Sequence, residues 1–209
     1  MTAAGLLRYL ALPLAALGAM LACLPASAAG IVATVTDENG KPLSEAVITV
    51  TAAQPAPVPA AAAARLATAT IDQRNEMFMP EVVVIHTGGA VIFRDSDQVR
   101  HHVYSFSTIK QFEFVQSPGD VSAPVRFDQA GIAAIGCNIH DNMIAYVYVT
   151  DAPWAAVTGP DGAVDIGGLP AGHFAATVWH PRLRPGITLP LHALTLATAE
   201  TALSVTLPV

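Results

Sequence analysis

Short runs of β-branched and aromatic residues, separated by clusters of Gly, Pro, Asn and Asp, recur along the chain from residue 31 onward. Apolar residues at helical spacing are nearly absent, and short apolar runs between turn residues are typical of all-β proteins. Residues 31–36 and 46–51, for example, lie on either side of a turn segment that contains Asn39-Gly40. An Asn-Gly pair between two such runs is a strong hairpin signal, so we expect a β-hairpin here. The sequence therefore predicts an all-β protein.

The first 29 residues have the features of an export signal. Arg8 supplies positive charge, residues 10–24 form an apolar stretch too short to span a bilayer, and residues 26–28 (Ala-Ser-Ala) resemble a cleavage site. We therefore expect a periplasmic protein with no membrane span in the mature chain. A lipoprotein anchored through Cys23 is the weaker alternative, because Met20 is a poor opening residue for that motif.

The charge of the chain limits its partners. Removal of the leader takes away Arg8 and leaves nine basic against sixteen acidic side chains, a net charge of −7. Nucleic-acid binding needs clustered Lys and Arg to neutralise phosphates, so we expect no nucleic-acid partner. The mature chain also keeps one cysteine, Cys137, although cysteines of exported proteins usually pair in disulfides. Such a cysteine is a buried apolar residue, a reactive thiol or a metal ligand.

The neighbours of Cys137 favour a metal ligand. His140 and Met143 follow it at intervals of three residues, on a short loop between two apolar runs. Thiolate and thioether sulfur suit Cu(I), imidazole suits both copper oxidation states, and a weak thioether ligand tunes the potential. Two imidazoles and a thiolate also hold zinc, so these residues alone leave the metal open. His101 or His102 offers the second histidine, and because adjacent strand residues point to opposite faces, we do not expect both to bind one ion.

Residues 78–149 resemble the cupredoxins, the small blue-copper proteins, and the elements that carry the resemblance follow the order of that family. They are Phe78-x-Pro80, Gly88-Gly89, Val91-x-Phe93-x-Asp95-x-Asp97, His101-His102-Val103, Phe127-x-x-x-Gly131 and Cys137-x-x-His140-x-x-Met143. The short final loop is similar to that of the amicyanins. The stretches around His101 and Cys137 also resemble exported cupredoxin-like proteins labelled methylamine-utilisation proteins. The resemblance implies a Greek-key β-sandwich.

The same resemblance implies a ligand set, in which His101, Cys137, His140 and Met143 bind one type 1 copper ion. His102 falls where the family has an asparagine that ties the two ligand loops together, so it is the alternative ligand or a residue that supports the site. Four protein ligands leave no open position for a substrate, so we do not expect an enzyme. An enzyme with Cys137 as nucleophile and His140 or His101 as base would need an oxyanion motif, and none is recognisable.

A second resemblance concerns the flanking segments. Residues 35–48 are similar to the opening hairpin of a carboxypeptidase regulatory-like, or transthyretin-like, domain, and the rest of that pattern appears after residue 155. It comprises Val157-Thr158-x-x-Asp161-Gly162-x-x-x-Ile166, Leu169-Pro170-x-Gly172-x-Phe174 and Thr177-Val178-Trp179-His180-Pro181. We therefore expect the cupredoxin unit to be inserted into, or packed beside, a second small β-sandwich. The expected divisions are 1–29 for the signal peptide, 30–51 for the first hairpin, 52–69 for an Ala/Pro linker, 70–150 for the cupredoxin domain and 151–209 for the remainder of the second sandwich.

Together these features predict a periplasmic type 1 copper protein that carries single electrons between redox protein partners. A copper carrier or buffer that delivers the metal to an exported enzyme is the alternative, because the same ligands would serve it. A reversible midpoint potential with fast self-exchange favours the first function, whereas rapid transfer of Cu(I) to a chelator favours the second.

Overall fold

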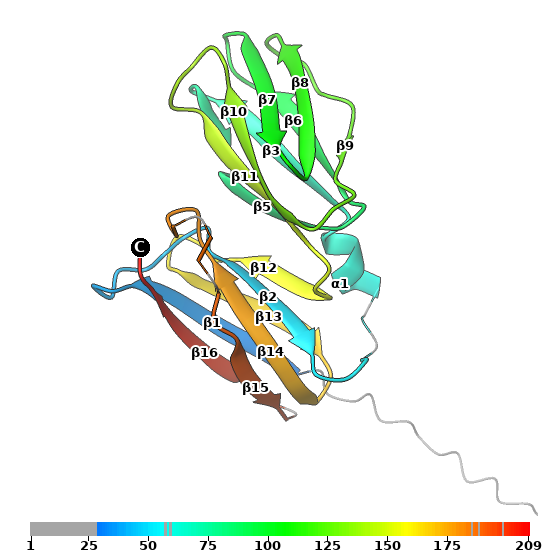
Figure 1. The fold of residues 1–209 in the computed structure, drawn as a ribbon, viewed down its shortest axis with the longest axis vertical. Coiled ribbons are helices and arrows are strands. Elements are labelled where there is room, and N and C mark those ends of the chain that lie inside the picture. Colours follow the sequence, from blue (N-terminus) through cyan, green and yellow to red (C-terminus); the bar gives the residue numbers. More distant parts are fainter. Residues whose placement is uncertain (1–28, 57, 59, 185, 188, 198) are drawn as a thin grey trace, which may run out of the picture.

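The computed structural model describes residues 29–209 except 57, 59, 185, 188 and 198, so residues 1–28 of the predicted leader, with Cys23, lie outside the described residues. Strands account for nearly all of the regular secondary structure of the described chain, which confirms the all-β prediction. These strands form two β-sandwiches, one above the other in Figure 1, and each has two sheets. The one helix of the described residues, α1 (Ala60–Arg65), connects the two sandwiches. Within this part of the chain, no helix is both long enough and apolar enough to cross a membrane.

The lower sandwich in Figure 1, which we call the flanking sandwich, combines strands from both ends of the described chain. One sheet has the order β13-β1-β16 and the other the order β12-β2-β14-β15. The strands are β1 (Ala29–Asp37), β2 (Val47–Ala52), β12 (Trp154–Val157), β13 (Ala163–Leu169), β14 (Gly172–Trp179), β15 (His192–Leu196) and β16 (Thr201–Leu207). Alternate residues of β1, Ile31 and Val35 among them, are buried in one core with Val178 of β14.

The two strands of the predicted first hairpin form, but they belong to different sheets. The turn itself is present, because the Asp37 carboxylate accepts the backbone amides of Asn39 and Lys41, each at 2.9 Å. After the turn, the Leu43 amide donates to the Val35 carbonyl at 2.9 Å and the Leu43 side chain enters the core, so the chain crosses to the opposite sheet before β2 begins. The prediction of a paired hairpin is therefore wrong. The Asn-Gly signal marks where the chain reverses, whereas burial of Leu43 decides which sheet the next strand joins.

The upper sandwich, which we call the central sandwich, is formed by the strands between residues 68 and 150. One sheet has the order β5-β11-β10-β7-β8 and the other the order β4-β3-β6-β9. The strands are β3 (Thr68–Arg74), β4 (Met77–Met79), β5 (Val82–His86), β6 (Ala90–Asp95), β7 (His101–Ser107), β8 (Lys110–Gln116), β9 (Val125–Arg126), β10 (Gly131–Cys137) and β11 (Ile144–Thr150). The buried side chains of Phe93, Phe127 and Ile135 fill the space between the sheets.

The two sandwiches contact each other through the outer face of the five-stranded sheet. The rings of Tyr146 and Tyr148 on β11 contact the ring of Trp179 on β14, with centroids 5.7 and 5.5 Å apart. The side chain of Val82 on β5 is buried in the core of the flanking sandwich. An aromatic cluster and a shared apolar contact therefore hold the central sandwich against the flanking one.

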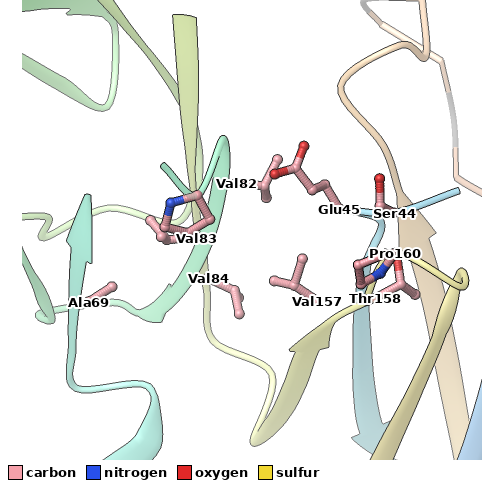
Figure 2. Close-up of a pocket in the computed structure, with 11 residues that line it drawn as sticks. Ser44, Glu45, Ala69, Val82, Val83, Val84, Val157, Thr158 and Pro160 are labelled. Carbon is pink, nitrogen blue, oxygen red and sulfur yellow. The ribbon is translucent and has the colours of Figure 1, made fainter. Parts of the chain in front are cut away.

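A cleft of about 550 Å³ lies beside this contact and is lined by residues of both sandwiches (Figure 2). Val84 of the central sandwich and Val157 of the flanking one face each other across it. At its edge, the carboxylate of Glu45 accepts the backbone amide of Glu81 at 3.0 Å. Burial, and next the neighbouring Glu45 carboxyl, raise the pKa of Glu81. The cleft is thus mainly apolar, with the Glu45 carboxyl at its edge.

Candidate metal centre

Two paired strands of the five-stranded sheet bring His101 and Cys137 together. His101 is the first residue of β7 and Cys137 is the last of β10, and the strands pair antiparallel with Cys137 opposite Val103. Beyond the last pair, the Asn138 amide donates to the His102 carbonyl at 3.0 Å and keeps the start of the ligand loop beside β7. The sheet therefore delivers a histidine from far upstream to the loop that holds the other predicted ligands.

Three donor atoms meet at this point. Cys137 Sγ lies 3.8 Å from His101 Nδ1 and 3.8 Å from His140 Nδ1, and the two imidazole nitrogens are 3.2 Å apart. The two imidazole rings meet edge to face, with centroids 4.9 Å apart. His101 and Cys137 are buried, whereas His140 is half-buried. Within the described residues, these three side chains form the cluster of donors that can hold a metal ion.

The separations between the donor atoms fit a single metal ion. Zinc bonds of about 2.0–2.1 Å to imidazole nitrogen and about 2.3 Å to thiolate sulfur set the scale for such ions. Two nitrogen bonds can together span about 4 Å, and a nitrogen with a sulfur bond slightly more, so one ion can contact all three atoms. Two imidazoles and a thiolate are also a donor set that copper accepts in both oxidation states. The residues present therefore fit the predicted copper ion.

Met143 lies beside this cluster. Its side chain is buried in the same apolar core as Cys137, and both residues line one surface pocket. The Met143 amide donates to the His140 carbonyl at 3.3 Å, which closes the ligand loop into a compact turn. The role of Met143 as a weak fourth ligand stays a prediction from the resemblance.

His102 faces away from the cluster. Its half-buried ring places Nε2 at 3.6 Å from Glu113 Oε2 on the neighbouring strand β8. Adjacent residues of a strand point to opposite faces, which separates this ring from the buried ring of His101. The His102 carbonyl nevertheless accepts the Asn138 amide. A backbone hydrogen bond therefore ties the two ligand loops together, where the resemblance predicts an asparagine side chain.

Two carboxylates lie behind His101. The cupredoxin-like pattern of the sequence contains both, but the sequence alone assigns them to a turn at the end of a strand and to no role at the metal. Asp97 Oδ2 is 3.3 Å from His101 Nε2, off the axis of the ring N–H, and Asp95 Oδ1 is 4.0 Å from the same nitrogen. Burial raises the pKa of Asp95, whereas a hydrogen bond from the Glu76 amide holds the pKa of Asp97 below its usual value. Aspartates after a strand are ordinarily turn residues, and both do accept turn amides. Their place six and four residues before a histidine ligand is the signal that could have revealed them.

Comparisons with known proteins give distant likenesses. No family model matches the chain, and no curated protein matches it. Among solved structures, it is similar to a purple cupredoxin from Nitrosopumilus maritimus, at 21% identity and TM-score 0.36, over 39% of this chain and 99% of that chain. It is also similar to amicyanin from Paracoccus versutus, at 20% identity and TM-score 0.36, over 49% of this chain and 98% of that chain. A third likeness is to a copper-containing nitrite reductase from Thermus scotoductus, at 19% identity and TM-score 0.36, over 58% of this chain and 28% of that chain.

Likenesses at this distance do not assign the chain to a family. The fold and the site instead define a class by their own features: an all-β protein of two sandwiches, with two imidazoles and a thiolate gathered at the end of one of them.

Proposed function

We propose that this protein is a periplasmic type 1 copper protein that carries single electrons between redox protein partners. The observation that supports it most is the meeting of His101 Nδ1, His140 Nδ1 and Cys137 Sγ within 3.8 Å of one another. Two imidazoles and a thiolate, with a weak axial thioether, are the donor set of blue-copper electron-transfer sites. We assign the thioether to Met143.

A copper ion bound at this site supplies a one-electron couple between Cu(II) and Cu(I). The protein contributes a donor set that the sheet positions, because His101 and Cys137 lie on paired strands. Donors held in one arrangement for both oxidation states keep the structural cost of each electron transfer low. Four protein ligands leave no position for a substrate, so we do not propose catalysis at the metal.

The proposed partners approach the end of the central sandwich at His140. Of the three donors in the cluster, His140 is the one that is partly exposed. Ile139 and Ile144, which lie on either side of it along the chain, are 49% and 46% exposed. Exposed apolar side chains around a partly exposed ligand suit a short-lived contact with another redox protein.

We also propose that the two sandwiches are two domains. Residues 70–150 would form the copper-binding domain, and residues 30–51 with 151–209 would form a transthyretin-like domain that the copper-binding domain interrupts. The sheet order supports this division, because β1 lies between β13 and β16, and β2 between β12 and β14. Both junctions fall between the same two sandwiches, at residues 53–67 and at 151–153.

A second candidate function is a copper carrier that delivers the metal to an exported enzyme. A surface pocket of about 360 Å³ favours this alternative, because Cys137 and Met143 line it together with Asp141. The two sulfur-bearing side chains line this pocket but are themselves buried, so transfer of the ion to an acceptor would require the pocket to open.

The visible spectrum of the copper-loaded protein tests the proposed function. We expect an intense band from charge transfer between the Cys137 thiolate and Cu(II), and loss of that band in Cys137→Ser. A folded, copper-loaded sample without colour, together with equal copper affinity of Cys137→Ser, would contradict the proposal. A reversible midpoint potential with fast self-exchange supports electron transfer, whereas rapid release of Cu(I) to a chelator supports the carrier. Zinc-loaded protein, expected to be colourless, is the control for the metal.

A further inference from the structure

We propose that Asp97, anchored by the buried Asp95, is a positioning residue that fixes which ring nitrogen of His101 faces the metal. The negative charge of Asp97 also favours Cu(II) over Cu(I). This inference rests on the proposed copper site. The pair contacts neither the thiolate nor His140, and it acts through the His101 ring.

The two nitrogens of the His101 ring have opposite surroundings. Nδ1 faces Cys137 Sγ at 3.8 Å and His140 Nδ1 at 3.2 Å, whereas Nε2 faces the carboxylate of Asp97 at 3.3 Å. A neutral imidazole carries its proton on one nitrogen, and a carboxylate favours the nitrogen that is protonated. Although Asp97 Oδ2 lies off the axis of the ring N–H, its negative charge beside Nε2 favours the proton on that nitrogen and leaves the Nδ1 lone pair directed at the metal position.

The Asp97 carboxylate is held in place on several sides. Oδ2 accepts the Glu76 amide at 2.7 Å and Oδ1 accepts the Gln98 amide at 3.1 Å. The Asp97 amide donates to Asp95 Oδ1 at 3.0 Å, and the Asp95 side chain is fully buried. A carboxylate with this many restraints cannot follow the imidazole if the ring turns. The Asp97 carboxylate therefore stays in place and favours one orientation of the His101 ring.

A layer of buried amides lies behind the carboxylates. Gln73 stands opposite Asp95 in the β3–β6 pairing, and Gln116 stands opposite His101 in the β7–β8 pairing. Gln73 Nε2 donates to Gln116 Oε1 at 2.9 Å, and Gln116 Nε2 donates to the Phe93 carbonyl at 3.1 Å. Burial of polar side chains in a core is costly unless they are paired. A polar layer, paired within itself and with the backbone, therefore crosses the apolar sandwich at the level of His101.

The sign of the electrostatic effect follows from the position of the charge. A carboxylate close to a ligand ring attracts Cu(II) more than Cu(I). Its removal should therefore weaken Cu(II) binding more than Cu(I) binding and raise the reduction potential.

The first test needs no metal and no variant. Long-range ¹H–¹⁵N correlation spectra of the full-length, metal-free protein report which nitrogen of each histidine carries the proton. The expected result is a proton on Nε2 of His101. A proton on Nδ1 would overturn the inference, even if the copper site itself is correct.

The second test compares Asp97→Asn with Asp128→Asn. Asp128 is 70% exposed and lies 3.8 Å from Arg126, so this control removes the same charge from the surface. Asp97→Asn should mix the two His101 tautomers, weaken Cu(II) binding about 10–100-fold and raise the potential. Asp97→Glu should restore part of each property. Equal tautomer, affinity and potential in Asp97→Asn and Asp128→Asn would contradict the inference, whereas a wild-type protein without the thiolate band would contradict the proposed function instead.

Discussion

Each sandwich contains a buried histidine, and the two are surrounded in opposite ways. In the flanking sandwich, His180 Nε2 bonds to the Ser44 carbonyl at 3.0 Å and Nδ1 accepts the Arg182 amide at 3.1 Å. In the central sandwich, His101 Nδ1 faces Cys137 and His140, and its Nε2 faces Asp97. Backbone partners satisfy a histidine that only completes a fold. A histidine with a chemical role is instead surrounded by side chains that ionise or bind metals.

Replacement of each of the two histidines by alanine should give the largest difference between the two sandwiches. His101→Ala should abolish the thiolate band and lower Cu(II) affinity by more than the roughly 10–100-fold that supporting residues contribute. His180→Ala should leave both properties unchanged. A copper titration followed by absorption measures them together. Equal losses in the two variants would mean that both sandwiches contribute to the metal site.

Truncation of Trp179 probes the contact between the sandwiches. Trp179→Ala removes the ring that meets Tyr146 and Tyr148, and large-to-small changes of buried aromatics typically cost about 3–5 kcal/mol of unfolding free energy. Because the donors lie at the far end of the central sandwich, the visible band of the folded variant should persist. Urea unfolding followed by circular dichroism measures the loss. The control is Leu191→Ala at a 73% exposed position, which should change the unfolding free energy by less than about 0.5 kcal/mol. A change equally small in Trp179→Ala would contradict the packing described.

The structural histidine should also be visible in the pH dependence of stability. Burial lowers the pKa of His180, so the unfolded chain binds its proton more tightly than the folded chain does. The contribution is therefore full above the unfolded pKa of about 6.5 and is lost as the pH falls from there through the lowered folded pKa. His180→Ala leaves the Ser44 carbonyl and the Arg182 amide without this partner, which should cost about 1–3 kcal/mol at pH 8 and flatten the slope below pH 6.5.

Urea unfolding between pH 5 and pH 8 measures both changes. The control is His173→Ala, at an exposed position, which should change the stability at pH 8 by less than about 0.5 kcal/mol. An unchanged slope in His180→Ala would show that this ring does not titrate as described.

The smallest expected change in stability and copper binding is that of a variant at His102, the residue next to the predicted ligand His101. His102→Ala removes a partly exposed contact with Glu113, which should change stability by less than about 1 kcal/mol. The visible band and the copper affinity should stay as they are, because the backbone bond from Asn138 remains. Loss of the band in this variant would make His102 the ligand in place of His101.

The features that sequence reasoning could supply are local. Turn residues and short apolar runs predicted the strands, and the spacing from Cys137 to Met143 predicted a ligand loop, because both patterns lie within a few residues. Local patterns could not predict which sheet β2 joins, because that choice depends on burial of Leu43 against strands that are distant in the sequence. The contact between Asp97 and His101 also depends on the path of a loop in space, so its two aspartates looked like ordinary turn residues.

X-ray absorption at the copper edge tests the central claim most directly, because it reports the donor atoms themselves. The protein loaded with one copper should show two nitrogen neighbours and one short sulfur neighbour in both the Cu(II) and the Cu(I) states. The sulfur should disappear in Cys137→Ser. A shell of nitrogen and oxygen alone, or a donor set that changes between the two states, would contradict a copper site built from His101, His140 and Cys137.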